Sequence, residues 1–293
     1  MALMSKLRHS RPTRFIRAGL RWIHRHKYRE GAPLPCVVAP GREFQIYPKG
    51  ELIDFLPFMP LFERTEMQLV ARLLKPHMNV IDAGANIGIY SLLAAKCIGD
   101  DGKIWSFEPS QTTFNLFLDN IALNQVKTVS AHRLALSDAQ GQLTLRSENG
   151  FGDLYRHLDY GGKAAPGDLI ETVDVSTLDD FAASNNIDEI DFLKIDVEGG
   201  EYCLLKGSQH LLSRPPNVIV MVEIEEDWCL RNGFKTEDAF ELLRSLGFTL
   251  YSWSKRQARW STDASELSKS RTVWATRNSR LLDDAVLTCE PKA

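Results

Sequence analysis

The chain has 293 residues, of which 44% are hydrophobic and 25% are charged, and its formal net charge is -3. This length leaves room for one large globular domain or two modest ones. No stretch approaches the roughly 18 apolar residues of a membrane-spanning helix. The five cysteines are scattered and form no C-x-x-C pair. These features exclude a spanning protein, a disulfide framework and a zinc knuckle, and they favour a reducing, cytoplasmic compartment.

Residues 1–30 form a basic arm that differs from the rest of the chain. They hold nine Lys and Arg against one acid, so the remaining chain has a formal charge of -11. At about 100° per residue, Arg14, Arg17, Arg21 and Arg25 share one helical face, and apolar residues such as Trp22 lie opposite. Such a helix can bind the anionic inner face of a membrane. A solvated helix, one docked on its own acidic domain and a cleaved transit peptide are the alternatives. The acidic body argues against a nucleic-acid partner.

The order of the remaining segments predicts the fold class. Residues 31–78 are rich in Pro and Gly and predict a linker with a short strand near 43–47, followed by a helix. Between residues 79 and 277, short apolar strands alternate with helices, and residues 278–293 form a C-terminal tail. This alternation predicts an α/β fold with a mostly parallel sheet and helices on both faces. Ligands bind such sheets at the carboxyl ends of the strands, where the strand order reverses.

The first strand of this region ends in a glycine-rich turn. Asp82 is followed by Gly84, Asn86 and Gly88 in the stretch DAGANIG. Glycine permits a positive φ and close backbone approach to a ligand. The spacing differs from the G-x-G-x-x-G of dinucleotide-binding proteins. A carboxylate beside the turn would repel a pyrophosphate but suit an ammonium group. The pattern therefore favours an amino-acid-bearing nucleoside over NAD, and a purely structural turn is the alternative.

The next strand ends in Glu108, within the stretch WSFEPS. An acid at the end of the second strand can accept hydrogen bonds from both hydroxyls of a ribose. Glu108 could instead cap the helix that follows. Together with Asp82, it predicts a nucleoside site.

A later strand brings more acids to the same rim of the sheet. It ends in Asp196, and Glu198 and a Gly199–Gly200 pair follow. Lys194 lies inside this strand, where an ammonium group is costly unless it is paired. Glu223 ends another apolar strand and is expected at the same rim, or as a cap. The three rim acids predict a catalytic base. Carboxylates are also ligands for Mg²⁺, but no spacing in the sequence supports a metal site.

Four segments resemble the FkbM family of S-adenosyl-L-methionine-dependent methyltransferases: DAGANIGIYSLLAA, FEPSQTTFNLFLDNIALN, ALSDAQGQLTL and FLKIDVEGGEYCLLKGS. The resemblance covers residues 79–277 and implies the seven-stranded, Rossmann-like class I methyltransferase fold with a final antiparallel strand. It implies that the glycine turn holds the methionine end of the cofactor and that Glu108 binds the ribose. Ser137 and Asp138 would lie near the adenine, and Asp196 near the cofactor amine and the acceptor.

The resemblance also implies a class of reaction, since similar family members methylate hydroxyl oxygens of sugars or of natural products that carry them. We expect an O-methyltransferase acting on a sugar, a glycoconjugate or a glycosylated natural product. Methylation of a non-sugar small molecule, or a non-catalytic cofactor-binding protein held at a membrane, are the alternatives. A nicotinamide dehydrogenase would need the G-x-G-x-x-G pattern that is missing here.

Several side chains are candidates for roles around the acceptor. Asp196 or Glu198 is the expected base, with Glu223 in reserve. His157, in the loop stretch GFGDLYRHLD, could act as a base from a lid, or be merely exposed. Three aromatic residues near the C-terminus could stack on sugar rings: Tyr251, Trp253 and Trp260.

Overall fold

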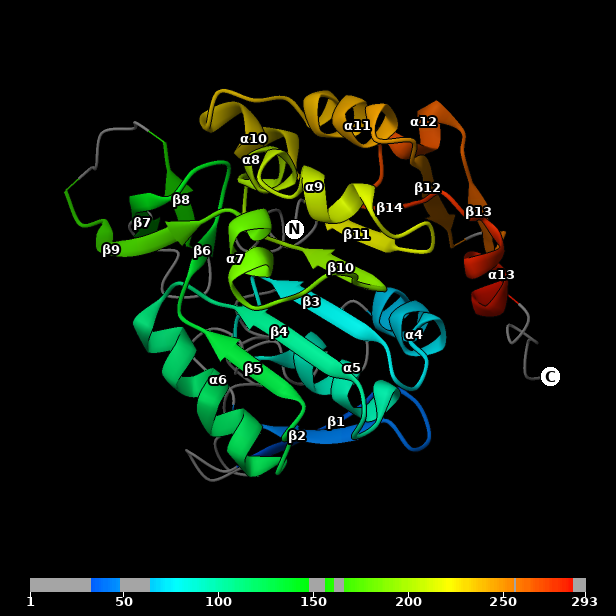
Figure 1. The fold of residues 1–293 in the computed structure, drawn as a ribbon, viewed down its shortest axis with the longest axis horizontal. Helices are drawn as coiled ribbons and strands as arrows, with labels where there is room; N and C mark the ends of the chain where they lie inside the picture. Colours follow the sequence, from blue (N-terminus) through cyan, green and yellow to red (C-terminus); the bar gives the residue numbers. More distant parts are fainter. Residues whose placement is uncertain (1–32, 48–63, 148–155, 161–165, 256, 287–293) are drawn as a thin grey trace, which may run out of the picture.

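The computed structural model describes residues 33–47, 64–147, 156–160, 166–255 and 257–286. The basic arm and its predicted membrane-binding helix lie outside these residues. Within the described ranges, no helix is both long enough and apolar enough to cross a bilayer. Figure 1 shows a central sheet with helices on both faces, and a smaller sheet near the end to which the arrows of the central strands point.

The central sheet has eight strands, and their order is the main topological feature. Five of them run parallel, and the strand that pairs with the last of the five is antiparallel to it. Their spatial order is β5 (Val129–His132), β4 (Lys103–Phe107), β3 (Asn79–Ala83), β10 (Phe192–Ile195), β11 (Ile219–Glu223), β14 (Thr272–Thr276), β12 (Thr249–Ser254) and β13 (Arg259–Ser261).

This order confirms the expected class I methyltransferase fold. Within the central sheet, β3, β4 and β5 follow one another outward, and β10 then returns to pair with β3 on its other side. The strand order therefore reverses between β3 and β10, which is where ligands bind in such sheets. The edge strand β13 is an eighth strand beyond the seven that the sequence predicts. It exists because residues 259–261 fold back onto β12 as a short antiparallel partner.

Alternate residues of the central strands face two separate cores, as the pleat of a strand requires. Ile81 packs into one core and Val80 into the other. The first core is covered by α7 (Leu178–Ser184), α8 (Glu201–Lys206), α9 (Gln209–Ser213), α10 (Glu226–Arg231), α11 (Thr236–Ser245) and α12 (Ala264–Leu267). The second is covered by α4 (Arg64–Leu73), α5 (Ile89–Ile98) and α13 (Arg280–Val286), with α6 (Gln111–Leu123) at its border. Figure 1 shows the two groups of helices on opposite sides of the sheet.

A second, four-stranded sheet lies between β5 and α7 in the chain. Its order is β6 (Ala135–Leu136), β9 (Leu169–Ser176), β7 (Gly141–Ser147) and β8 (His157–Asp159). The sequence predicts the two longer strands but treats the intervening residues as a loop. Leu145 and Leu158 are buried between these strands and give the small sheet a core of its own. Its inner face is therefore available to form a wall beside the central sheet.

The segments before residue 79 and after residue 277 also contain ordered elements. The region expected as a linker forms a hairpin of β1 (Leu34–Val37) and β2 (Glu43–Ile46), held by Asn120, whose Oδ1 accepts the N–H of Tyr47 at 2.6 Å. The segment expected as a tail contains α13, and Arg72 of α4 donates to the carbonyl of Ala285 at 3.1 Å. The helix predicted near 201–212 is divided into α8 and α9. Gly207 lies at the division, in close contact with the carbonyl of Ser137.

Candidate functional site

The glycine turn after β3 is shaped by close contacts with its neighbours. Gly84, Asn86 and Gly88 all have positive φ angles, of 79°, 51° and 92°. A Cβ atom on Gly84 would lie 1.8 Å from the carbonyl oxygen of Asp196, and one on Gly88 would lie 2.3 Å from the ring of Phe117. Glycine is thus required at both positions because the turn packs directly on the end of β10 and on α6. The same packing brings the turn and Asp196 together.

The predicted role of Asp82 as a direct ligand is not what the structure displays. Its side chain is almost fully buried below the turn, where its Oδ2 accepts a 2.6 Å hydrogen bond from Ser91. Its Oδ1 lies 3.7 Å from the Nζ of Lys194. Burial raises the pKa of Asp82, while Lys194 and Ser91 act in the opposite direction. Side chains of successive strand residues point to opposite faces of the sheet, so those of Asp82 and Ala83 point in opposite directions. The side chain of Asp82 points to the face that α5 covers and is therefore buried.

Glu108 lies where the sequence predicts it, at the end of β4 beside the glycine turn. Its Oε2 accepts the backbone N–H of Asn86 at 3.0 Å, and its Oε1 accepts that of Ser110 at 2.8 Å. These bonds fix the carboxylate plane. Each carboxylate oxygen has two lone pairs and can accept more than one hydrogen bond.

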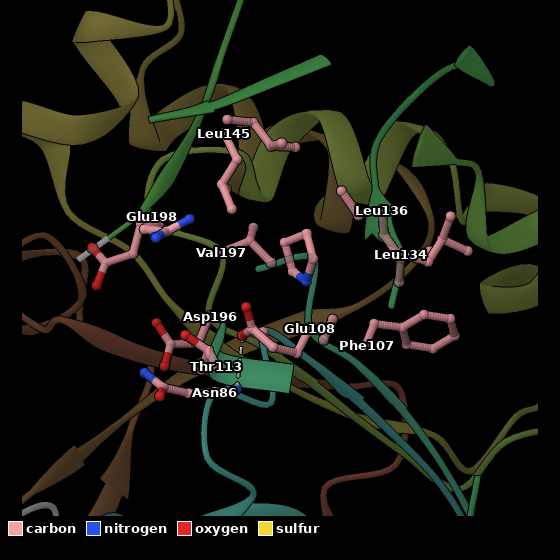
Figure 2. A pocket seen from close by; sticks show the side chains of 16 residues that line it. Asn86, Phe107, Glu108, Thr113, Leu134, Leu136, Leu145, Asp196, Val197 and Glu198 are labelled. Carbon is pink, nitrogen blue, oxygen red and sulfur yellow. Dashed lines mark hydrogen bonds between the residues drawn. The ribbon is translucent and has the colours of Figure 1, made fainter. Parts of the chain in front are cut away.

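A cavity of about 680 Å³, partly open to solvent, extends from the glycine turn along the strand ends. Its lining comes from the ends of β3, β4 and β10, the start of α6, and the small sheet. Figure 2 shows the polar side chains of Asn86, Asp196 and Glu198 on one side and the apolar Leu134 and Leu136 on the other. The site is therefore amphipathic, as an aminoacyl nucleoside requires.

One polar atom beside the cavity lacks a partner in the described part of the chain. The side-chain oxygen of Asn86 is buried and has no hydrogen-bond partner among the described residues. Buried polar atoms normally have partners, and an exception requires an explanation. The turn that carries Asn86 leaves backbone close to the cavity without side chains in between. The cavity thus offers acceptor groups, at Asn86 and Glu108, of the kind that a ligand with ammonium and hydroxyl donors would need.

Ser137 and Asp138, expected near the adenine, do not line this cavity. Ser137 is buried and shares a 3.0 Å hydrogen bond with the hydroxyl of Tyr160. Asp138 accepts a 2.6 Å bond from the Nζ of Lys206, which holds the pKa of its carboxyl below the usual value. The residues just before them, 134–136, form the wall instead. The residues before Ser137 thus give the cavity an apolar wall, while Ser137 and Asp138 are paired with Tyr160 and Lys206.

A smaller cavity of about 200 Å³ adjoins the first, and Asp196 and Glu198 line both. Its other walls come from α10 and from the ends of β11 and of the loop before β14. Here Arg271 contacts Glu223 at 3.1 Å and Glu225 at 2.5 Å. The structure thus brings all three predicted rim acids to one place. It also shows that Glu223 is part of an ion pair.

Glu198 has an unusual position at the junction of the two cavities. Its φ angle is 53°, in the left-handed region that favours glycine. Burial raises the pKa of Glu198 well above that of an ordinary glutamate, and repulsion from Asp196 and Glu201 adds to the effect. Glu201, at the start of α8, accepts the N–H of Gly199 at 2.9 Å, and burial raises its pKa to about 7. The turn therefore places one carboxyl with an elevated pKa at the junction and a second one below it.

His157 does not occupy a lid. It lies in β8, where its side chain is buried with its ring 4.8 Å from that of Trp228. The loop expected around it is interrupted by a strand, because residues 157–159 pair with β7. Trp228 itself lines the smaller cavity.

The three C-terminal aromatic residues line neither cavity. Trp260 contacts Trp253 and Trp274 at ring distances of 4.8 and 5.4 Å, and its Nε1 donates to the carbonyl of Leu282. They belong to the core that α13 covers. The prediction that they stack on a sugar ring is therefore wrong. The polar residues around Trp260 in the sequence hide the strand pairing that directs the side chain inward.

Sequence reasoning missed several residues of the site. Arg156, from β8's flank, lines the larger cavity and forms a 2.7 Å ion pair with Glu171. Arg271 and Trp228 line the smaller one. The stretches EGGE and EIEE signal Glu201 and Glu225 through their density of acids, whereas nothing near Arg271 in the sequence indicates its role. Among the described residues, no group of three His, Cys, Asp or Glu side chains is arranged to hold a metal ion.

The strand order and this amphipathic cavity at the switch point define the class: a class I methyltransferase fold with a nucleoside-type site. The family model described as "Methyltransferase FkbM domain" matches residues 82–250, which is more than half of the chain. The chain belongs to this family.

Two curated fungal proteins are similar in sequence. "Methyltransferase 1" of Beauveria bassiana (strain ARSEF 2860) is 32% identical over 145 residues, covering 44% of this chain and 57% of that protein. "Methyltransferase sdnD" of Sordaria araneosa is 29% identical over 157 residues, covering 44% and 59%. The match thus spans less than two thirds of the length of either relative.

Solved structures are also similar to this chain. A methyltransferase FkbM from Methylobacillus flagellatus KT has a TM-score of 0.40 at 14% identity, covering 78% of this chain and 55% of that one. A SAM-dependent O-methyltransferase from Thermotoga maritima has a TM-score of 0.42 at 12% identity, covering 86% and 76%.

Proposed function

We propose that this protein is an S-adenosylmethionine-dependent O-methyltransferase acting on a hydroxyl of a sugar, a glycoconjugate or a glycosylated natural product. One observation carries the proposal: Asp196 and Glu198 line both the larger and the smaller cavity. A methyl donor in the first and an acceptor in the second would meet at these two carboxyl groups. Family membership and the amphipathic lining support the donor, and the polar walls of the smaller cavity support a hydroxyl-bearing acceptor.

In this proposal, the larger cavity binds the cofactor, and each part of the cofactor contacts a different set of residues. Asn86 and the backbone of the glycine turn hold the amino-acid end, together with Asp196. Glu108 accepts from the ribose hydroxyls, and Leu134 and Leu136 pack on the adenine. When bound, S-adenosylmethionine supplies an activated methyl group that a correctly placed oxygen can take. The residues' main contribution is alignment of the two reactants.

Glu198 is the proposed base. A neutral hydroxyl must lose its proton as it attacks, and a base works best when its pKa is close to the working pH. The raised pKa of Glu198 moves it in that direction from the ordinary value of a glutamate. Asp196 is the neighbour that orients the hydroxyl. Glu223, bound to Arg271, shapes the smaller cavity.

Calorimetric titration with S-adenosylhomocysteine tests the donor part of the proposal. We expect the folded protein to bind S-adenosylhomocysteine in the micromolar range. Absence of binding would contradict S-adenosylmethionine as the cofactor. Methyl transfer from labelled cofactor to a panel of glycosides, their deoxy analogues and their aglycones tests the acceptor part. Transfer only to compounds with a sugar hydroxyl supports it, whereas transfer to aglycones favours a non-sugar acceptor.

Substitution of the proposed base completes the test. Glu198→Gln should reduce transfer by roughly 10²–10⁴-fold, the usual contribution of a general base, while S-adenosylhomocysteine still binds. Glu237→Gln, on an exposed part of α11, is the matched control and should leave transfer unchanged. If the protein binds the cofactor and Glu198→Gln transfers methyl groups as fast as the wild type, a different residue is the base. If the wild type binds the cofactor but transfers no methyl group to any acceptor, a non-catalytic protein is favoured.

We also propose peripheral contact between the basic arm and the anionic inner face of a membrane, because a helix there would place Arg14, Arg17, Arg21 and Arg25 on one face. Sedimentation with vesicles that contain phosphatidylserine, compared with neutral vesicles, tests it. Replacing the set Arg14, Arg17, Arg21 and Arg25 by Gln should abolish the difference. Equal sedimentation of both proteins would contradict membrane contact.

A further inference from the structure

Lys194 is a charged residue in the middle of the fold. It lies in β10, the strand next to β3, and its side chain is only 3% exposed. Its Nζ is 3.1 Å from Oδ2 of Asp196 and 3.7 Å from Oδ1 of Asp82. A buried ammonium group is costly unless its environment compensates the charge. The two carboxylates supply that compensation.

Further contacts of the ammonium group come from the glycine turn and from α5. The Nζ donates to the carbonyl oxygen of Gly84 at 3.5 Å and lies 4.8 Å from the centre of the Tyr90 ring. One side chain thus connects the end of β3, the turn, the start of α5 and the end of β10. These are the elements that form the amino-acid end of the larger cavity.

The two carboxylates bound by Lys194 differ in what else they contact. Asp82 is buried, and Ser91 also holds it. Asp196 is 29% exposed and reaches the cavity. The ammonium group therefore lies between a buried carboxylate and one that reaches the cavity. The three charges sum to one negative charge, which is located next to the cavity and complements a ligand cation.

We infer that Lys194 is a positioning residue that holds Asp196 in place to bind the ammonium group of the cofactor's amino-acid end. The inference rests on the proposed function, because it needs a ligand with that group. It assigns Asp82 to the support of Lys194 and Asp196 to the ligand. The two acids that the sequence places side by side at this end thus have different tasks.

The test uses two ligands that share the adenosine and its 5′ sulfur atom and differ in the group attached to that sulfur. S-Adenosylhomocysteine carries the amino-acid group, and 5′-methylthioadenosine lacks it. Because Lys194→Met alone leaves Asp82 buried without its cation, the main variant is Asp82→Asn/Lys194→Met, compared with Asp82→Asn. Asn still accepts from Ser91, and removing both charges of a buried pair costs much less stability than removing one. Lys255→Met, which removes an exposed ammonium group from its ion pair with Glu66, is the matched control.

We expect the double variant to bind S-adenosylhomocysteine about tenfold more weakly than Asp82→Asn, as loss of a charged hydrogen bond implies. Its affinity for 5′-methylthioadenosine should be unchanged, and Lys255→Met should change neither. A merely structural role of Lys194 would instead lower the melting temperature while leaving the ratio of the two affinities unchanged. An unchanged ratio overturns the inference.

Asp196→Asn provides an independent check that leaves Lys194 and Asp82 in place. Since Lys194 acts through Asp196, adding Asp82→Asn/Lys194→Met to Asp196→Asn should cost little further affinity. Full additivity of the two losses would overturn the inference. A folded wild-type protein that binds neither ligand would overturn the proposed function itself, and this result differs from an unchanged ratio between two measurable affinities.

Discussion

The carboxylate of Glu108 accepts the backbone N–H of Asn86 at 3.0 Å, so the acid at the end of β4 is bonded to the glycine turn that follows β3. The turn itself is bonded back to β4, since Gly84 and Ala85 both donate to the carbonyl of Phe107. The proposed ribose site and the proposed amino-acid site are therefore one rigid unit. A change in Glu108 should affect the turn as well as the ligand contact.

Glu108→Ala should weaken binding of S-adenosylhomocysteine by at least about tenfold, because it removes two charged hydrogen bonds to a ribose and releases two backbone N–H groups. The loss should be similar for 5′-methylthioadenosine, since both ligands contain the ribose. Calorimetry with the two ligands measures this. Glu237→Ala on α11 is the control. Unchanged affinity for both ligands would contradict a ribose contact at Glu108.

Gly84→Ala should be far more harmful than Gly41→Ala, although the φ angles of these glycines are 79° and 74°. Both substitutions force an L-residue into the left-handed region, at a cost of about 1–2 kcal/mol. At Gly41, no atom lies within 4 Å of the added Cβ, whereas at Gly84 the carbonyl oxygen of Asp196 is 1.8 Å away. Denaturant unfolding should give a larger loss of stability for Gly84→Ala, with loss of ligand binding. Equal losses would show that the turn can move away from β10.

The sequence predicts the rim of the sheet better than the directions of its side chains. Apolar runs end in Asp82, Glu108, Asp196 and Glu223, and parallel topology brings such ends to one edge. The burial of Asp82 has a different origin. It depends on contacts with Ser91 and with Lys194, which is 112 residues away in the chain. The sequence of one strand does not tell whether the acid at its end points into the core or into the cavity.

The parts of the site that could not be predicted depend on pairing over long distances in the chain. Arg271 and Glu223 are 48 residues apart, and no local pattern couples them. The small sheet is likewise built by β8, a strand of three residues. Such a strand has too little alternation to stand out from a loop. His157 therefore resembles a lid residue in the sequence and is a core residue in the fold.

Trp260→Phe should lower stability without affecting the site. The substitution removes the indole N–H that donates to the carbonyl of Leu282 at 2.9 Å, and it reduces contact with Trp253 and Trp274. The loss of one hydrogen bond and some packing suggests a decrease of about 1–3 kcal/mol in the free energy of unfolding. Thermal unfolding measures this, and S-adenosylhomocysteine affinity should remain unchanged. Normal stability with impaired acceptor use would revive a sugar-stacking role.

Glu201 should make the protein lose stability as the pH rises through the weakly acidic range. Its pKa is raised from 4.5 to about 7 because the carboxyl is buried at the start of α8. Since the folded state binds this proton more tightly than the unfolded state, the contribution to stability is fully present below pH 4.5. It is lost as the pH rises towards 7, by roughly 3 kcal/mol in all. The buried carboxyls of Asp82 and Glu198 have raised pKa values and act with the same sign.

Glu201→Gln isolates this contribution, because glutamine cannot titrate but can still accept from the N–H of Gly199. Near pH 4.5 the variant and the wild type should be about equally stable, since the protonated acid resembles the amide. The variant should become relatively more stable as the pH rises to 7, and the difference should then be constant. Urea unfolding at a series of pH values measures it. A difference that does not change between pH 4.5 and 7 would mean that Glu201 titrates as an ordinary glutamate, and that its bond to Gly199 outweighs the cost of burial.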